Sequence, residues 1–317
     1  MANLNQIVCQ DTGGSNTGIP ACFLDPKQII GVIITPVGYT IKAADMATLQ
    51  TKLQADTMAG AGARIYPLIN FVALSADNTQ KPVMQNLGYG FSLFVREGNY
   101  DLSFQYTDGG LCLHKQLRAF NNKNWGIFLV DADGVLYGYK SGSDLQSIPL
   151  VQFYAEPWKM NDGSKVAEFI VSVSFKPQYL NEWVGFLSTA ADFDIATSVV
   201  GLINLTVSQV TALAAGSVKV QVATSCGGSN LYDQYKAALS LVGAWSATNA
   251  STGTVIPIAS VTANDADKSF TVAFTTTAPP YPATGGKLNL SLASAADLAA
   301  LATPMVGYES NVLVETV

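Results

Sequence analysis

The sequence predicts a mainly β (α+β) protein: a β-sandwich or barrel-type domain with one flanking helix, followed by a smaller C-terminal β domain. Three observations predict this fold class. Short runs in which apolar and polar residues alternate recur along the chain, and such alternation is typical of strands with one buried face. Clear helical spacing is confined to a few segments, and a length of 317 residues suggests more than one domain.

The composition of the chain changes near residue 200. Of the 17 lysines and arginines, 13 lie in residues 1–200, whereas Ala, Thr, Ser, Val and Leu dominate residues 201–317. We therefore expect a β-rich domain over residues 1–200 and a C-terminal β domain over residues 201–317, joined within the segment 188–201. A Gly-rich arm at residues 9–20 is expected to be extended or a loop.

In the first domain, the apolar run Ile29–Pro36 predicts the first strand. A helix is predicted over residues 42–59, where apolar residues recur near helical spacing and glycines follow. The residues that carry this prediction are Met46, Leu49, Leu53, Met58, Gly60 and Gly62.

Strands dominate the rest of the first domain. The segment 167–175 (AEFIVSVSF) places Phe and Val on one face and Ser on the other, which indicates a sheet with one buried face. Turn residues predict hairpins within REGNYDLSF (96–104) and VDADGVLYG (130–138). The other predicted strands are Ile65–Ala73, Phe91–Glu97, Asp101–Tyr106, Gly126–Val130 and Val135–Tyr139.

The second domain alternates in the same way, and two capped helices interrupt it. Asn230, with Asp233, can cap one helix, and Ser294, with Asp297, can cap the other. We expect a compact β domain of an immunoglobulin-like kind, although it lacks the Cys…Trp…Cys pattern of true immunoglobulin domains. The alternating residues are Val218, Val220 and Val222, then Phe270, Val272 and Phe274, then Leu288, Leu290 and Leu292.

The chain is poor in charge: 13% of its residues are charged and 49% are hydrophobic. Its best apolar run, Ile29–Val37, is much shorter than the ~20 residues that a membrane-spanning helix needs, so no membrane partner is expected. No secretory signal is apparent, so we expect synthesis in a cytoplasm. A net charge of −6 argues against ordinary nucleic-acid binding, but it suits a surface past which DNA slides without sticking.

The cysteine and histidine content argues against common catalytic and metal sites. Cys9, Cys22, Cys112 and Cys226 have the spacing of neither a zinc site nor a disulfide scaffold, and a bridge between Cys9 and Cys22 is left open. His114 is the single histidine. We expect it at a polar position of a short amphipathic segment, so a histidine-based catalytic triad is not predicted.

Two acidic patterns are better explained by structure than by chemistry. Asp131–Gly134 begins like a calcium loop, but Leu136 and Gly142 stand where an EF-hand needs Gly and Glu, so a hairpin turn is predicted. Asp192 and Asp194 would share a face of a strand, and we interpret them as a solvated linker rather than an acid–base pair.

No aromatic or glycine pattern supplies a binding site. Tyr281, in the turn PPYPATGG, is the aromatic residue most expected to be exposed, although packing is the commoner role of such a ring. The glycines form no nucleotide-binding motif. The sequence therefore predicts no enzyme, no cofactor and no catalytic, cofactor-binding or metal-binding residue.

The pattern as a whole nevertheless resembles a known class of proteins. Three stretches carry the resemblance: LGYGFSLFVREGNYDLSFQYTDGGLCLHKQLRAFN (87–121), NWGIFLVDADGVLYGYKSGSDLQSIPLVQFYAEPWKMNDG (124–163) and AEFIVSVSFKPQYLNEWVGFL (167–187). With the rest of residues 22–187, they resemble structural proteins of tailed bacteriophages, and within these the major tail tube proteins.

The resemblance implies a self-assembling virion protein located in the phage tail and made in the host cytoplasm. Six subunits would form a ring, and stacked rings would form a tube through which DNA passes without specific binding. The arm from Cys9 to Pro20 would bridge rings, residues 201–317 would decorate the outside, and other tail proteins would be partners. No functional residue carries over, because shape and assembly are the function.

Two alternatives stay open at this point. The chain could be another virion component, such as a capsid-decorating, head–tail connecting or tail-tip protein, which shares this composition. It could also be a carbohydrate-binding or adhesive module in which residues 201–317 bind the ligand.

Overall fold

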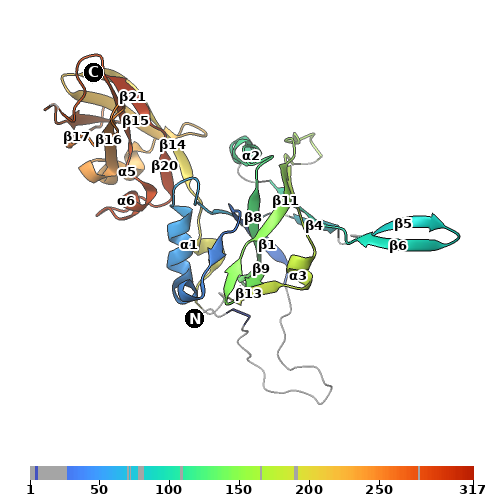
Figure 1. The fold of residues 1–317 in the computed structure, drawn as a ribbon. Coiled ribbons are helices and arrows are strands. Elements are labelled where there is room, and N and C mark those ends of the chain that lie inside the picture. Colours follow the sequence, from blue (N-terminus) through green and yellow to red (C-terminus); the bar gives the residue numbers. More distant parts are fainter. Residues whose placement is uncertain are drawn as a thin grey trace. The chain divides into compact units, whose positions relative to one another are not determined.

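The computed structural model describes residues 4–5, 27–69, 71, 73–77, 82–107, 110–164, 166–188, 192–277 and 279–317 (Figure 1). The fold is mainly β, as predicted. The chain divides into two compact units, unit 1 (Met1–Val200) and unit 2 (Gly201–Val317), so the division falls where the composition changes. The expected Gly-rich arm, with Cys9 and Cys22, lies outside the described residues.

An eleven-stranded sheet forms the body of unit 1, in the order β2-β10-β9-β8-β11-β12-β7-β4, with β1 paired to β3 and β8, and β13 paired to β9. A separate two-stranded ribbon consists of β5 and β6. The strands are β1 (Ile29–Pro36), β2 (Thr40–Ile41), β3 (Tyr66–Ile69), β4 (Ala73–Asp77), β5 (Val83–Gly88), β6 (Phe91–Arg96), β7 (Tyr100–Tyr106), β8 (Trp125–Asp131), β9 (Val135–Ser141), β10 (Asp144–Gln146), β11 (Ile148–Ala155), β12 (Phe169–Phe175) and β13 (Val184–Ser188).

The helices of unit 1 are short. The predicted helix 42–59 is in fact a 3₁₀ segment, η1 (Ala43–Thr48), followed by an α-helix, α1 (Leu49–Thr57). The apolar residues that predicted it have the expected role, because Met46, Leu49 and Leu53 are buried. The other helices are α2 (Gly110–Arg118), α3 (Gln178–Asn181) and α4 (Ile195–Ser198).

Strands β1 and β8 are buried on both faces, and this gives unit 1 its layers. On one face, Ile33 and Phe128 share a core cluster with Leu49 and Leu53 of α1, which is the flanking helix that the sequence predicts. On the other face, a second cluster joins β1 and β8 to β7, β11 and β12. Members of that second cluster include Val32, Ile34, Ile127, Leu129, Leu102, Phe104, Phe153, Phe169, Val171, Val173 and Phe175.

One predicted hairpin is confirmed and the other is wrong. VDADGVLYG forms the β8–β9 hairpin, with Leu129 opposite Tyr137. REGNYDLSF does not form a hairpin, because β6 pairs with β5 whereas β7 pairs with β12 and β4. The predicted strand Ile65–Ala73 is likewise divided between β3 and the first residue of β4. Local turn residues gave no information about these long-range pairings.

Unit 2 is a β-sandwich of a five-stranded sheet, β17-β18-β15-β14-β20, and a three-stranded sheet, β16-β19-β21. The alternating Val, Phe and Leu residues predicted for its strands are all buried in one core. Ser294 caps α6 through the amide of Asp297, as predicted. The elements are β14 (Ile203–Ala214), β15 (Ser217–Thr224), α5 (Tyr232–Leu239), η2 (Val242–Ala244), β16 (Trp245–Asn249), β17 (Ile258–Asn264), β18 (Ser269–Phe274), β19 (Lys287–Leu292), α6 (Ala295–Ala299), β20 (Tyr308–Ser310) and β21 (Leu313–Thr316).

Candidate functional site

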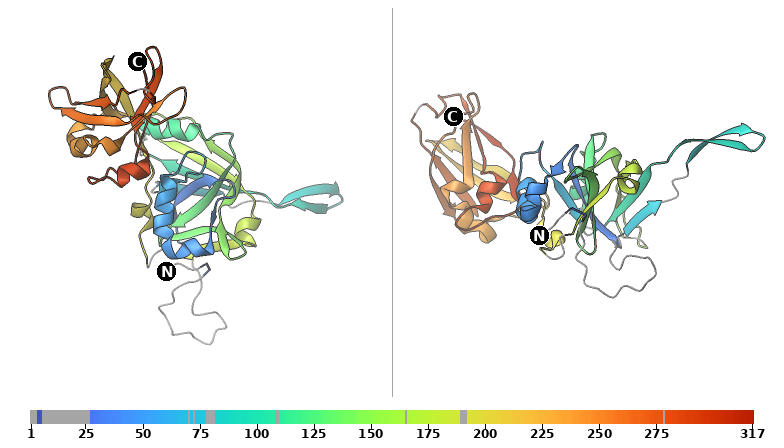
Figure 2. Two further views of the ribbon diagram at one scale, coloured as in Figure 1. Left: turned by 60° about the vertical axis from the view of Figure 1, so that its left-hand side comes forward. Right: turned by 60° about the horizontal axis from the view of Figure 1, so that its bottom comes forward.

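The most unusual surface of unit 1 is the ribbon formed by β5, its turn and β6, which we call the apolar hairpin (Val83–Arg96). Figures 1 and 2 show it extending away from the rest of the unit. Every residue of both strands is exposed. Eight exposed residues of the apolar hairpin are large and apolar, seven in the strands and Tyr89 in the turn: Val83, Met84, Leu87, Tyr89, Phe91, Leu93, Phe94 and Val95.

This amount of exposed apolar surface is costly for an isolated chain. Tyr89 is 105% exposed and Phe91 is 72% exposed, and an aromatic side chain offers about 150–250 Å² for burial. The largest apolar patch on a typical monomer is only about 300–600 Å², and larger ones mark interaction sites. A two-stranded ribbon is also at best marginally stable alone in water. The apolar hairpin is therefore a candidate docking arm.

Only half of this element was predicted from the sequence. The pattern indicated β6 but not β5, because turn residues favoured pairing of β6 with β7. A weak signal was present: Gly88-Tyr89-Gly90 stands directly before the strand-forming run of β6, as a hairpin turn would. Position in the chain alone could not show that neither face of this hairpin packs against the core.

A pocket of about 370 Å³ lies at the base of the apolar hairpin. We call it the base pocket. Its walls contain aromatic rings and polar side chains. These come from the apolar hairpin, from β7 and from the region of α3. The lining residues are Pro82, Phe94, Glu97, Gly98, Tyr100, Pro177 and Asn181.

A second surface, the polar sheet face, lies on the side of β4, β7, β12 and β11 that points away from the core. The pairing register places Ser75, Ser103, Ser172 and Tyr154 side by side across the four strands. The hydroxyl oxygens of Ser103 and Ser172 lie 3.2 Å apart. The face also includes Asp101, Gln105, Gln152 and Ser174, and one apolar residue, Ile170, opposite Gln105.

The charge of these four strands is negative. Their sequences are ALSAD, YDLSFQY, IPLVQFYA and FIVSVSF, which contain two aspartates and neither lysine nor arginine. The strands themselves offer a polyanion hydroxyl groups and carboxylates but no cation. One lysine lies at the edge of the face, where Lys159 pairs with Glu168 at 3.6 Å and Glu168 accepts a hydrogen bond from Gln105.

His114 is buried, although we expected it at a polar position of a short amphipathic segment. It lies in α2, is 6% exposed and contacts the rings of Trp158 and Phe169, which also stack on each other. Its Nε2 is 2.6 Å from the carbonyl oxygen of Glu156. The only histidine thus joins α2 to the end of β11, as a structural residue.

The cysteines also differ from expectation. Their spacing indicated no disulfide scaffold, but Cys112 in α2 and Cys226 in unit 2 are each disulfide-bonded, and the described residues include no free cysteine. Sequence spacing predicted no disulfide framework because it does not show which distant positions approach one another.

The two acidic patterns have structural roles. Asp131 is buried and closes the β8–β9 turn as predicted: its carboxylate accepts hydrogen bonds from the amides of Asp133 and Val135 at 3.0 and 2.8 Å and from the Tyr137 hydroxyl at 2.8 Å. Asp194 is not in a strand. It caps α4 by accepting a hydrogen bond from the amide of Ala196 at 2.9 Å.

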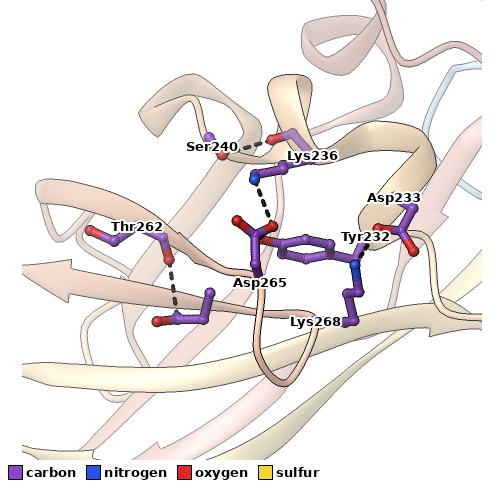
Figure 3. A network of polar contacts seen from close by, with 8 residues as sticks. Tyr232, Asp233, Lys236, Ser240, Thr262, Asp265 and Lys268 are labelled. Atoms are coloured by element: carbon purple, nitrogen blue, oxygen red, sulfur yellow. Dashed lines mark hydrogen bonds and ion pairs between the residues drawn. The ribbon is translucent and has the colours of Figure 1, made fainter.

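In unit 2, charged side chains gather around Tyr232 and attach α5 to the β17–β18 turn (Figure 3). Asp265 accepts hydrogen bonds from Lys236 at 2.6 Å and from the Tyr232 hydroxyl at 2.9 Å. Lys268 forms an ion pair with Asp233 at 2.6 Å. Both lysine ammonium groups lie over the Tyr232 ring, 5.6 and 5.2 Å from its centre.

These contacts shift the ionisation of the groups involved. The hydrogen bond from Lys236 lowers the pKa of Asp265 below its usual value, and the same bond raises the pKa of Lys236. The hydrogen bond to Asp233 raises the pKa of Lys268. Because these charges are paired with one another, we interpret the cluster as a clamp between two elements rather than a ligand site.

The described part of unit 2 carries no exposed aromatic side chain. Tyr281, the ring most expected to be exposed, is 8% exposed and packs near Phe274. Tyr281 therefore has a packing role, which is the commoner role for a ring in such a turn. A sugar-binding platform of stacked aromatic rings is therefore not present among these residues.

The described ranges show neither a metal-binding cluster nor a membrane-spanning helix. They contain no group of three or more His, Cys, Asp or Glu residues placed to hold a metal ion. None of their helices combines the length and the apolar character needed to cross a membrane. No protein-family model matches this chain, and the search of curated proteins found no match.

Proposed function

We propose that this chain is a structural subunit of a tailed-bacteriophage virion, which assembles with copies of itself into stacked, six-membered rings that form the tail tube. The apolar hairpin carries this proposal. It exposes eight large apolar residues that only a partner surface can bury. A protein that functions alone has no use for such an arm, whereas a subunit of a large assembly needs one.

The polar sheet face also supports this function, through polar groups rather than the apolar groups of the hairpin. Its strands carry acids and hydroxyl groups without a basic residue, so it suits the wall of a passage for DNA. Unit 2, proposed to be immunoglobulin-like, then decorates the outside, because it has a core of its own and its exposed apolar residues are aliphatic, with no exposed aromatic ring among the described residues. Other tail proteins would contact the ends of the tube.

The proposal is tested by observing purified protein by negative-stain microscopy and sedimentation velocity over a range of concentrations. Wild-type protein should form rings or hollow tubes of uniform width. A variant with Tyr89→Ser, Phe91→Ser and Leu93→Ser should stay monomeric, because the arm has lost its apolar surface. The matched control changes three exposed valines of unit 2 to serine, Val255→Ser, Val306→Ser and Val312→Ser, and should assemble like the wild type.

Two outcomes would contradict the proposal: wild-type protein that is strictly monomeric at high concentration, or a hairpin variant that assembles as well as the control. Closed oligomers that never extend would contradict the tube and would favour a decorating or connecting virion protein instead. Copy number in the virion separates these classes, since a tube subunit should be among the most abundant proteins.

A further inference from the structure

The tip of the apolar hairpin presents one aromatic ring in a strained backbone conformation. Gly88, Tyr89 and Gly90 have φ values of 84°, 51° and 80°. The left-handed region costs a non-glycine residue about 1–2 kcal/mol, and Gly would fit the middle position without that cost. Tyr89 instead occupies it, with its side chain fully exposed. A strained residue that gains no contact within its own chain points to a role in a contact with another molecule.

The base pocket has the shape and chemistry to receive a tyrosine. Two prolines and two aromatic rings, Phe94 and Tyr100, supply apolar walls, and the volume of about 370 Å³ lies within the usual range for ligand pockets. Tyr100 is held in place, because it stacks on Phe175 at 5.5 Å and its hydroxyl donates to Asn181 Oδ1 at 2.9 Å.

The polar groups of the pocket match the phenol hydroxyl of a tyrosine. The carboxylate of Glu97 can accept a hydrogen bond from it, and the amide nitrogen of Asn181 can donate one to it. A purely aliphatic side chain would leave both groups without a partner on the incoming residue. The pocket thus favours a tyrosine over a leucine or valine from elsewhere on the exposed surface.

The ring that enters the base pocket must come from another copy. Seven residues separate Tyr89 from Pro82 along an extended strand, which corresponds to roughly 20 Å at about 3.3 Å per residue. The tip and the pocket are therefore at opposite ends of one ribbon, so Tyr89 does not reach the pocket of its own chain. Each copy offers one tip and one pocket, two different surfaces that complement each other.

We propose that Tyr89 of one copy inserts into the base pocket of the next, in a head-to-tail contact. Such a contact uses different surfaces on the two partners, so it either closes into a ring or continues as a helical filament. The inference rests on the proposed self-assembly and deepens it, because it names the residue that docks and the site that receives it.

A photocrosslinking experiment on the full-length chain tests where the tip docks. Benzoylphenylalanine replaces Tyr89, and the protein is mixed with ¹⁵N-labelled wild-type protein before irradiation. Mass spectrometry should find crosslinks between labelled and unlabelled copies, at residues that line the base pocket. Crosslinks elsewhere, or only within one copy, would overturn the docking site.

Complementation of two defective variants tests the head-to-tail geometry. Tyr89→Ala removes the tip and keeps the pocket, whereas Asn181→Trp fills the pocket and keeps the tip. Each variant alone should associate at least about 30-fold more weakly than wild type, the loss expected when an interface hot spot is removed. Mixed together, they should form heterodimers that do not extend. Glu182→Trp, one residue beyond the pocket lining, is the matched control and should assemble normally.

The outcomes separate failure of this inference from failure of the proposed function. Assembly that survives both Tyr89→Ala and Asn181→Trp would overturn tip-in-pocket docking and leave self-assembly standing. Wild-type protein that never assembles would overturn both. Tyr89→Phe keeps the ring and loses only the hydroxyl, so it should weaken association by no more than about tenfold; a loss as large as that of Tyr89→Ala would contradict a pocket built mainly for the ring.

Discussion

Two hairpins of unit 1 have similar composition and opposite surroundings. In the β8–β9 hairpin, the residues from Gly126 to Asp131 are all buried. In the apolar hairpin, every residue of β5 and β6 is exposed. Both pair apolar antiparallel strands through a short turn, so the difference lies in what covers them: β8 lies between two core clusters, whereas β5 and β6 have no such layer on either face.

The two turns differ in the same way. Asp131 closes the β8–β9 turn with a buried carboxylate that holds backbone amides. The turn of the apolar hairpin has glycines at both sides of an exposed ring instead. An apolar strand sequence therefore identifies surface that will be buried, but it does not show whether the chain itself or a second copy buries that surface.

The largest contrast should come from removing one phenylalanine ring in each hairpin. Phe128→Ala in β8 should lower the free energy of unfolding by about 3–5 kcal/mol, because the ring is fully buried and a cavity remains. Phe91→Ala, at a 72% exposed position, should stay within about 0.5 kcal/mol. Urea unfolding followed by hydrogen exchange of β8 peptides, at a concentration where the protein is monomeric, measures both. Similar losses of unfolding free energy for the two variants would contradict the difference in burial between the two hairpins.

The next effect concerns the buried turn. Asp131→Ala should cost about 1–3 kcal/mol or more, because the amide of Val135 and the hydroxyl of Tyr137 lose a charged acceptor inside the protein. Asp133→Ala, at the exposed neighbouring position, is the control and should be nearly neutral. Thermal unfolding of the two variants under identical conditions checks this. A neutral Asp131→Ala would mean that the turn does not depend on its carboxylate.

A smaller effect should follow from substitutions at the positive-φ positions of the two turns. Gly134 has φ of 74°, so Gly134→Ala should destabilise unit 1 by about 1–2 kcal/mol. Tyr89→Gly relieves the same kind of strain at the tip of the apolar hairpin, and should leave the unfolding of the core unchanged within about 0.5 kcal/mol. Hydrogen exchange read separately for the two hairpins measures this. Destabilisation of the core by Tyr89→Gly would show that the arm is part of it.

The smallest effect should arise at a third turn, between β17 and β18. Hydrogen bonds from Lys236 and Tyr232 lower the pKa of Asp265. The ionised carboxylate therefore stabilises the folded state at pH values above the pKa that Asp265 has in the unfolded chain, and this stabilisation is lost as the pH falls below about 4. Carbon-detected titration of Asp265 should give a pKa below 3.8, the value from which it is lowered. Lys236→Gln should return it toward that value, and an unchanged pKa would contradict the clamp.

Much of the fold follows from local sequence. The alternation of Phe169, Val171, Val173 and Phe175 identifies the buried face of β12, because successive side chains in a strand point to opposite sides. The cap at Ser294 is equally local, since its side-chain oxygen accepts a hydrogen bond from the amide of Asp297. The predicted cap at Asn230 differs by one residue: the N-cap of α5 is Leu231, and Asn230 precedes it and accepts from the amide of Tyr232 at 2.8 Å.

The candidate site could be predicted only in part. The strand Phe91–Glu97 was visible as an apolar run, and the low charge of the chain indicated surfaces meant for burial. Three features could not be predicted, because each joins residues from different strands. These are the pairing of β6 with β5, the base pocket, and the register that brings Ser75, Ser103 and Ser172 together.

Local alternation in the sequence indicated the fold class and the apolar strand faces, and a change of composition along the chain indicated where the two units divide. The tertiary structure alone decided that His114 is buried, that Tyr281 packs inside unit 2 and that the apolar hairpin is left uncovered. The physical reason is that burial depends on which distant elements pack together. One apolar pattern stabilises a core where the chain covers it, and an interface where it does not.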